Sequence, residues 1–231
     1  MKPSFVGRSG FIPSGPSGQE LRVLDSLEEM GVRIMKKLLT LLLAGSLLAV
    51  LLPAQALAQQ WNLDPAHTNF FFEVKHTYAA VRGQFTQFTG DVYFDPDNPV
   101  KGRFDFVIKV DSVDTKIGKR DTHLRSPDFF DAKKFPEMVF KSSKVTRAGD
   151  NTFLVEGKLT IKDVTKDLVL EFAYLGQKDN PVKPGQLVAG LDASLTIDRL
   201  QYHVGDGKFY KMGVVGKDVD ILITLELLRK K

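Results

Sequence analysis

Phe153-Leu154-Val155-Glu156-Gly157-Lys158-Leu159-Thr160-Ile161 is the stretch that decides the fold of this chain. Its odd-numbered residues are apolar or glycine, and its even-numbered residues are polar except for Leu154. Because successive side chains of a strand point to opposite faces, this period of two predicts a strand with one buried face and one wet face. Sheets with one solvated face are typically antiparallel, so the stretch indicates an antiparallel, all-β fold.

The same alternation returns in seven other segments. They cover residues 70–76, a long strand from about 83 to 95, and residues 103–110, 138–142, 168–174, 187–197 and 218–227. Turn-forming residues separate several of them, as in Asp95-Pro96-Asp97-Asn98-Pro99 and Lys178-Asp179-Asn180-Pro181. Eight consecutive antiparallel strands either close into a barrel or split into a sandwich, and the alternation alone does not choose between the two.

The alternation breaks between Lys119 and Phe135. Residues 120–126 have no period of two and predict a short helix, and the Pro127–Asp131 stretch that follows predicts a turn. Asp121 is expected to cap the start of this helix. Arg120, Arg125 and Arg199 are expected to form ion pairs with Asp121, Asp128 and Asp131. An insertion of this kind between strands predicts a cap over one end of a barrel.

An export signal is predicted ahead of the strands. Met35-Lys36-Lys37 is followed by an apolar run over residues 38–52, by Pro53 and by Ala56-Leu57-Ala58, which is the order of a secretory signal peptide. The run is shorter than the about 20 residues of a membrane span, although a retained anchor helix is the alternative. We expect residues 35–58 to be removed after Ala58, and residues 59–231 to form one domain in the periplasm or outside the cell, without a stable membrane anchor. Residues 1–34 are interpreted as an upstream extension or a misassigned start.

The composition argues against several functions. The chain has no cysteine, a net charge of +4 and no run of five like charges, so a nucleic-acid surface is not supported. Its four histidines lack the close spacing of metal ligands, and no Gly-x-Ser-x-Gly motif presents a nucleophilic serine. We therefore predict no metal, no cofactor and no catalytic residue.

Several motifs along the domain carry a family resemblance. They are Trp61-x-x-Asp64-Pro65-x-His67, Arg120-Asp121-x-His123-Leu124, Asp128-Phe129-Phe130-Asp131, Leu159-Thr160-Ile161 with Val164-Thr165-Lys166 downstream, and Ile197-x-Arg199. From Trp61 to about Leu227 the chain resembles the YceI-like family of secreted bacterial proteins. It departs from the family at Asp163, where a glycine is common, and over residues 200–205. The resemblance implies a lipocalin-like barrel of eight antiparallel strands whose lumen takes a long isoprenoid or other lipid-like chain.

The apolar faces of the strands supply the candidate ligand-binding residues. An eight-stranded barrel is just wide enough to be filled by its own side chains or to hold one small ligand. A ligand-free stress-response or interaction module with a solid core therefore stays open as an alternative, and so does a lipid-modifying enzyme. No oligomeric state is predicted. The lumen candidates are Phe70, Phe72, Val74, Phe94, Phe104, Phe106, Ile108, Phe140, Phe153, Val155, Leu170, Phe172 and Leu191, and the cap candidates are Arg120, Asp121, His123, Leu124, Phe129 and Phe130.

Overall fold

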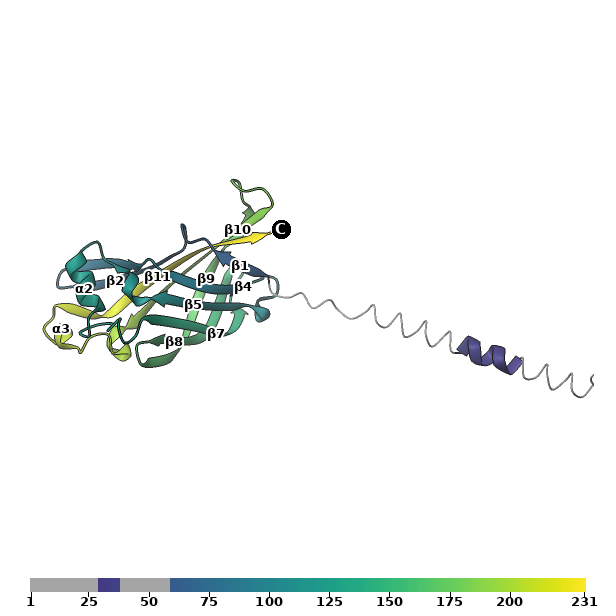
Figure 1. The fold of residues 1–231 in the computed structure, drawn as a ribbon, viewed down its shortest axis with the longest axis horizontal. Helices are drawn as coiled ribbons and strands as arrows, with labels where there is room; N and C mark the ends of the chain where they lie inside the picture. The colour runs from purple at the N-terminus through teal and green to yellow at the C-terminus, as the bar shows by residue number, and fades with distance from the viewer. Residues whose placement is uncertain (1–28, 38–58) are drawn as a thin grey trace, which may run out of the picture. The chain divides into compact units, whose positions relative to one another are not determined.

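The computed structural model of the protein describes residues 29–37 and 59–231 (Figure 1). The chain divides into two compact units, Met1–Ala56 and Leu57–Lys231. In the first unit, residues 29–37 are helical. The signal peptide predicted at residues 35–58 lies outside the described residues, apart from residues 35–37. Within the described ranges, no helix is long and apolar enough to cross a membrane.

The second unit is a sheet of eleven strand segments with short helices between them (Figure 1). The strands are β1 (Gln60–Leu63), β2 (Asn69–His76), β3 (Ala79–Phe85), β4 (Phe88–Tyr93), β5 (Arg103–Lys109), β6 (Val113–Asp114), β7 (Glu137–Arg147), β8 (Thr152–Ile161), β9 (Val164–Asp179), β10 (Gln186–Asp198) and β11 (Val215–Lys230). The helices are α2 (Gly118–Arg125), α3 (Lys208–Lys211) and the short 3₁₀ turns η1 (Pro99–Lys101), η2 (Val110–Ser112) and η3 (Arg199–Tyr202).

The segments close into one antiparallel barrel of eight strands, as predicted. The order around the ring is β1-β4-β5-β7-β8-β9-β10-β11, and β11 returns to β1 through the pairs Asn62↔Leu228 and Leu63↔Leu227. β2, β3 and β6 continue β1, β4 and β5 beyond short breaks, and β2 pairs with the first half of β11. Each of the eight predicted segments corresponds to one strand of the ring or its continuation, whereas β1 was not predicted. Closure of the ring rules out the sandwich.

One predicted strand is interrupted. The long strand expected over residues 83–95 is split into β3 and β4 at Thr86 and Gln87. Here the backbone N–H groups of both residues turn to Ser112 of η2, at 3.2 Å from its carbonyl oxygen and 3.1 Å from its hydroxyl oxygen. These two bonds take the place of ladder hydrogen bonds, so the strand is interrupted at this point.

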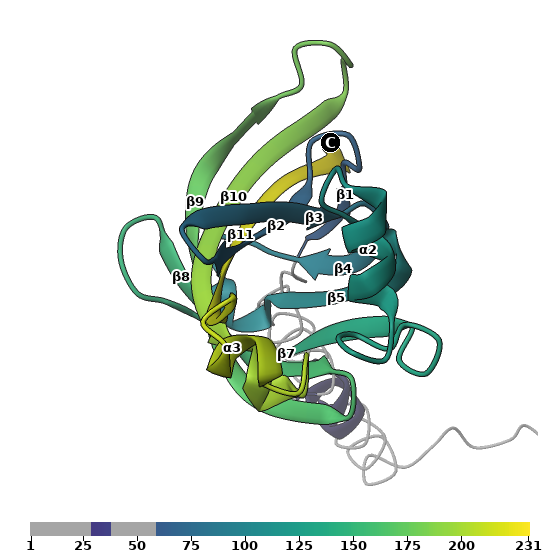
Figure 2. The ribbon, with the colours of Figure 1, turned by 90° about the vertical axis from the view of Figure 1, so that its left-hand side faces the viewer.

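The two ends of the barrel differ. α2 and α3 lie on either side of the mouth (Figure 2), whereas β1 and the C-terminus lie toward the opposite end (Figure 1). α2 is the predicted short helix, but the prediction that Asp121 caps it is wrong. Ile117 is the N-cap residue and makes no side-chain cap. Asp121 lies inside the helix, is buried, and accepts hydrogen bonds from the backbone N–H of Thr115, at 2.9 Å, and from its hydroxyl group. Asp121 therefore holds the loop that precedes the helix.

Candidate functional site

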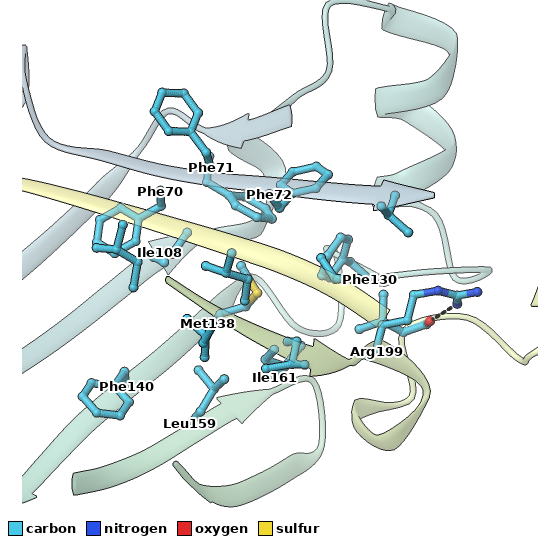
Figure 3. A pocket seen from close by; sticks show the side chains of 18 of the residues that line it. Phe70, Phe71, Phe72, Ile108, Phe130, Met138, Phe140, Leu159, Ile161 and Arg199 are labelled. Carbon is cyan, nitrogen blue, oxygen red and sulfur yellow. Dashed lines mark hydrogen bonds between the residues drawn. The ribbon is translucent and has the colours of Figure 1, made fainter. Parts of the chain in front are cut away.

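A cavity of about 160 Å³ lies inside the barrel and is partly open at the mouth. It is bordered by inward-facing side chains of the strands and by the segment after α2 (Figure 3). Phe70, Phe72, Ile108, Met138 and Phe140 come from three strands, β2, β5 and β7, and converge on it. All of the residues that line the cavity are apolar except Arg199. The cavity therefore suits an apolar ligand and offers little to a polar one.

The predicted lumen residues divide into two groups. One group lines the cavity: Phe70, Phe72, Val74, Phe106, Ile108, Phe140 and Leu170. The other group does not reach it and packs in the closed half of the barrel: Phe94, Phe104, Phe153, Val155, Phe172 and Leu191. Each residue of the second group is at most 1% exposed.

The closed half of the barrel is a solid plug of aromatic side chains. Phe94 contacts Phe153 edge to face with ring centroids 4.9 Å apart, and Phe104 stacks on Phe172 at 5.4 Å. Trp61 seals this end, since its indole N–H donates to the carbonyl oxygen of Phe94 at 2.9 Å. The barrel is therefore filled at its base and hollow toward its mouth.

Glycines on neighbouring strands explain why the cavity exists beside so many phenylalanines. A Cβ at Gly83 would lie 2.4 Å from the ring of Phe72, one at Gly90 would lie 2.7 Å from the ring of Phe106, and one at Gly157 would lie 2.7 Å from the ring of Phe140. Each ring thus lies against a backbone that carries no side chain. Because the rings occupy this space along the wall, they do not fill the centre of the lumen.

The predicted cap residues fall into two groups, those that line the cavity and those that do not. Leu124, Phe129 and Phe130 line the cavity. Arg120, Asp121 and His123 do not, and they hold the cap instead. Arg120 donates to the hydroxyl and carbonyl oxygens of Thr115, both at 2.7 Å, and His123 Nε2 lies 2.9 Å from an oxygen of Asp128.

The ion pairs predicted for the arginines are wrong. Among the described residues, Arg120, Arg125 and Arg199 form no salt bridge, and each donates to backbone carbonyl or hydroxyl oxygens. The acceptor oxygens belong to α2, η2, the start of β11 and two loops, and they lie within hydrogen-bond distance of the guanidinium groups. Buried carbonyl groups need donors, and the arginines supply them.

Arg199 is the one charged residue at the cavity, and it is 6% exposed. Its guanidinium group donates to the carbonyl oxygens of Val204, at 2.6 Å, Gly216, at 2.8 Å, and Val215, at 3.3 Å. Figure 3 shows it at one end of the cavity, with one of these bonds as a dashed line. Burial lowers the pKa of Arg199, but its ordinary value is far above neutral, so the group stays charged. Arg199 therefore ties η3 to β11.

Sequence reasoning missed many of the residues that line the cavity. These residues lie on the predicted apolar faces, but they are aliphatic, whereas the prediction favoured phenylalanine. The missed residues are Met138, Leu159, Ile161, Leu168, Leu195, Ile197, Val219, Ile221 and Ile223. Their signal was the phase of the alternation, since residues two apart share a face. Phe85 is the last residue of β3 and Val215 the first of β11, and Val204 lies in the loop after η3, so the alternation gives little guide at these positions.

Asp64, His67 and Glu226 form the one group of three potential metal ligands in the part of the chain that the structure describes. His67 Nδ1 lies 2.8 Å from an oxygen of Asp64 and 3.6 Å from an oxygen of Glu226. The hydrogen bond to Asp64, followed by the charge of Glu226, raises the pKa of His67, and the same bond lowers the pKa of Asp64. An ion pair between the histidine and the two acids accounts for the cluster.

A closed eight-stranded barrel with a solid base, an apolar cavity and a capped mouth defines a lipocalin-like fold. The sequence model of the YceI-like domain matches residues 61–227. The chain belongs to the YceI-like family.

Relatives and solved structures agree with this assignment. A UPF0312 protein of Photorhabdus laumondii is 34% identical over 201 residues, which cover 86% of this chain and all of that protein. The crystal structure of BcnA from Burkholderia cenocepacia has 27% identity and a TM-score of 0.63, and covers 73% of this chain and 100% of that one. A polyisoprenoid binding domain from Saccharophagus degradans has 14% identity and a TM-score of 0.53, with 74% and 98% covered, and so shares the fold.

Proposed function

We propose that this protein binds the tail of a long isoprenoid or similar lipid-like molecule in the barrel cavity, and carries it outside the cytoplasm. The observation that carries the proposal is the lining of the cavity, where the one polar side chain, Arg199, already donates to three carbonyl oxygens. A polar ligand buried there would lose its hydrogen bonds to water without replacement, whereas an apolar chain would lose nothing.

The energetics favour a long chain over a small ligand. Each 100 Å² of apolar surface removed from water contributes about 2.5 kcal/mol. Association itself costs at least about 4 kcal/mol, so micromolar binding requires roughly 500 Å² of buried apolar surface. A cavity of about 160 Å³ is of the size that accepts one benzene ring, which is too small for that area. The chain must therefore displace flexible lining residues such as Met138 or extend through the mouth.

The fold relationship supports the ligand class. The Saccharophagus degradans domain that shares this fold is described as binding polyisoprenoids. We infer the same class of ligand here from the apolar lining of the cavity. No catalytic residue is part of the proposal.

Solvent extraction of the purified protein, followed by mass spectrometry, tests the proposal. We expect an isoprenoid or another long-chain lipid in the extract, and its mass gives the head group and chain length. Phe106→Arg places a charge in the cavity wall and should abolish the retention of lipid. Val107→Arg is the matched control, since Val107 neighbours Phe106 on β5 but belongs to the other face of the strand. A folded Phe106→Arg variant that keeps its lipid, or a wild-type extract without lipid, would support a ligand-free module.

Export is tested separately. We infer from residues 35–58 that the mature chain begins at Gln59. The N-terminal sequence of protein recovered from the periplasm or medium should start there. Intact protein confined to the cytoplasm would contradict a carrier between membranes.

A further inference from the structure

The rim of the barrel mouth combines exposed apolar side chains with lysines. Three segments form it: the turn between β2 and β3, the residues where α2 begins, and α3 with the residues after it (Figure 2). We define the rim as residues 75–80, 116–119 and 207–213. We propose that the rim docks reversibly on the surface of a membrane that contains anionic lipids, and so opens the cavity onto the bilayer. The inference rests on the proposed function, since an isoprenoid tail dissolves in a bilayer and not in water.

Backbone contacts bring the three segments to one end of the barrel. The N–H of Thr77 donates to the carbonyl oxygen of Val214 at 2.8 Å, which joins the β2–β3 turn to the residues after α3. The pair Gln84↔Asp114 joins β3 to β6, so the chain that leads into α2 starts beside the same hairpin. The three segments therefore surround one opening, as Figure 2 shows.

Each segment presents at least one large apolar or aromatic side chain to water. These side chains are Tyr78, Ile117, Tyr210 and Met212. All four are at least 45% exposed, and Tyr78 is fully exposed. The other exposed apolar residues of the barrel are spread over β2, β9, β11, η1 and the β9–β10 turn. Apolar groups gathered around an opening mark an interaction site rather than ordinary surface.

α3 is fixed to the cap by one side chain and leaves others in water. The ring of Phe209 stacks on that of Phe129, with centroids 5.9 Å apart and an angle of 9° between the rings. Tyr210 and Met212, which follow it, remain exposed. The exposure of these two residues therefore belongs to a helix that is held in place, and not to a loose loop.

The rim segments carry only positive formal charge. Their charged residues are Lys75, Lys116, Lys119, Lys208 and Lys211, with no aspartate or glutamate. Two carboxylates border the rim. Asp114 pairs with Lys116 at 2.7 Å, and Asp206 accepts the backbone N–H of Lys208 at 2.9 Å. Five lysines with two bordering carboxylates leave an excess of three positive charges.

The groups behind the rim balance one another. Arg82 is paired with Glu73. A hollow of about 560 Å³ beside α3 adds one lysine, Lys162, and one carboxylate, Asp128, to the charges already counted. The excess of the rim is therefore not cancelled by these neighbours, and it complements the negative surface of a membrane with anionic lipids.

A lipid surface suits this rim because its contacts come from three separate segments around an opening. A bilayer interface adapts to such separate contacts, and tyrosine prefers it because the ring is apolar and the hydroxyl group is polar. The cavity wall also leads to the rim, since Val74 on β2 and Val215 on β11 line the cavity and stand next to the bonded Thr77 and Val214. A tail can thus pass from the bilayer into the cavity without crossing water.

Vesicle sedimentation tests docking in the absence of an isoprenoid. The mature protein, purified after export, is mixed with vesicles of phosphatidylcholine alone or with about one third phosphatidylglycerol. We expect tighter binding to the mixed vesicles, which weakens as salt rises. Lys119→Gln with Lys208→Gln should weaken this binding by about fivefold for each lysine. Tyr78→Ser with Met212→Ser should weaken binding to both kinds of vesicle.

The β9–β10 turn supplies the matched control. Val182 is 89% exposed and is followed by the exposed Lys183, and this turn lies beside the C-terminus, away from the mouth. Val182→Ser with Lys183→Gln should bind vesicles like the wild type. Brominated lipids then report the orientation. They should quench the fluorescence of Tyr78→Trp but not of Val182→Trp, over the constant background of the buried Trp61.

The outcomes separate docking from ligand binding. A wild-type protein that binds neither kind of vesicle, rim variants that bind like the wild type, or quenching of Val182→Trp alone would overturn docking at the rim. The lipid recovered by solvent extraction would still decide the proposed function. Docking through the rim by a protein whose extract holds no lipid would refute the proposed function and support the membrane surface by itself.

Discussion

Gly90→Ala tests whether glycines keep the cavity open. Gly90 on β4 is paired with Phe106 on β5. An added Cβ would lie 2.7 Å from the ring of Phe106 and 2.9 Å from a methyl group of Leu63, whereas ordinary contacts begin at 3.4 Å. The ring must therefore retreat by about 0.7 Å, and the free space beside it is the cavity. The variant should both strain the barrel and narrow its lumen.

The two contributions to the free energy of unfolding have opposite signs. Overpacking of this kind costs about 1–3 kcal/mol. Removing a glycine from a strand regains about 0.5–1 kcal/mol of chain entropy. A net loss near 1.5 kcal/mol lowers the melting temperature by about 3–6 °C in a domain of this size. Narrowing of the cavity should reduce the lipid recovered on extraction.

A double-mutant cycle measures the coupling between Gly90 and Phe106. In a Phe106→Leu background the ring is absent and only the flexible side chain of Leu63 must shift, so Gly90→Ala should cost less than in the wild type, with a coupling of about 1 kcal/mol or more in urea denaturation. Gly149→Ala is the control, because a Cβ there is 3.6 Å from its nearest neighbours. If Gly90→Ala were stabilising in the wild-type background and lipid content did not fall, the ring would not be held aside by the glycine.

Two further predictions concern the ends of the barrel. Arg199→Met should lower the free energy of unfolding by about 2–4 kcal/mol in urea denaturation, because three carbonyl groups lose a charged donor; stability equal to the wild type would show that water replaces it. His67 should titrate above its usual pKa by NMR, and Asp64→Asn should bring the value down. Since the pKa of His67 is raised, its contribution to stability is complete below the unfolded pKa and is lost as pH rises through the folded pKa. The lowered pKa of Asp64 makes the same pair weaken as pH falls through that value, so the contribution is complete between the ordinary pKa values of the two groups, about 4 and about 6.5. A His67 pKa unchanged by Asp64→Asn would contradict the pairing.

The strands were predicted well because their signal is local. Residues two apart share a face, so the alternation assigns Phe104, Phe106 and Ile108 to one apolar side of their strand. A helix was expected over residues 120–126, from the loss of alternation, and lies over residues 118–125. β1 was missed because four residues give too few repeats of the period. The role of Asp121 was misjudged because its partner, Thr115, lies in a loop whose path no pattern reports.

Eight amphipathic strands, and the buried side of each, follow from the amino-acid sequence alone, because both depend on side-chain direction within one strand. The positions at which the barrel is solid or hollow depend instead on which strands become neighbours. Phe106 lies along the wall because Gly90 is beside it, whereas Phe104 fills the base because it meets Phe172. The hollow lined by Asp128, Lys162 and Lys211 likewise gathers segments that are distant in sequence, and they meet because β7 to β11 are neighbours in the ring.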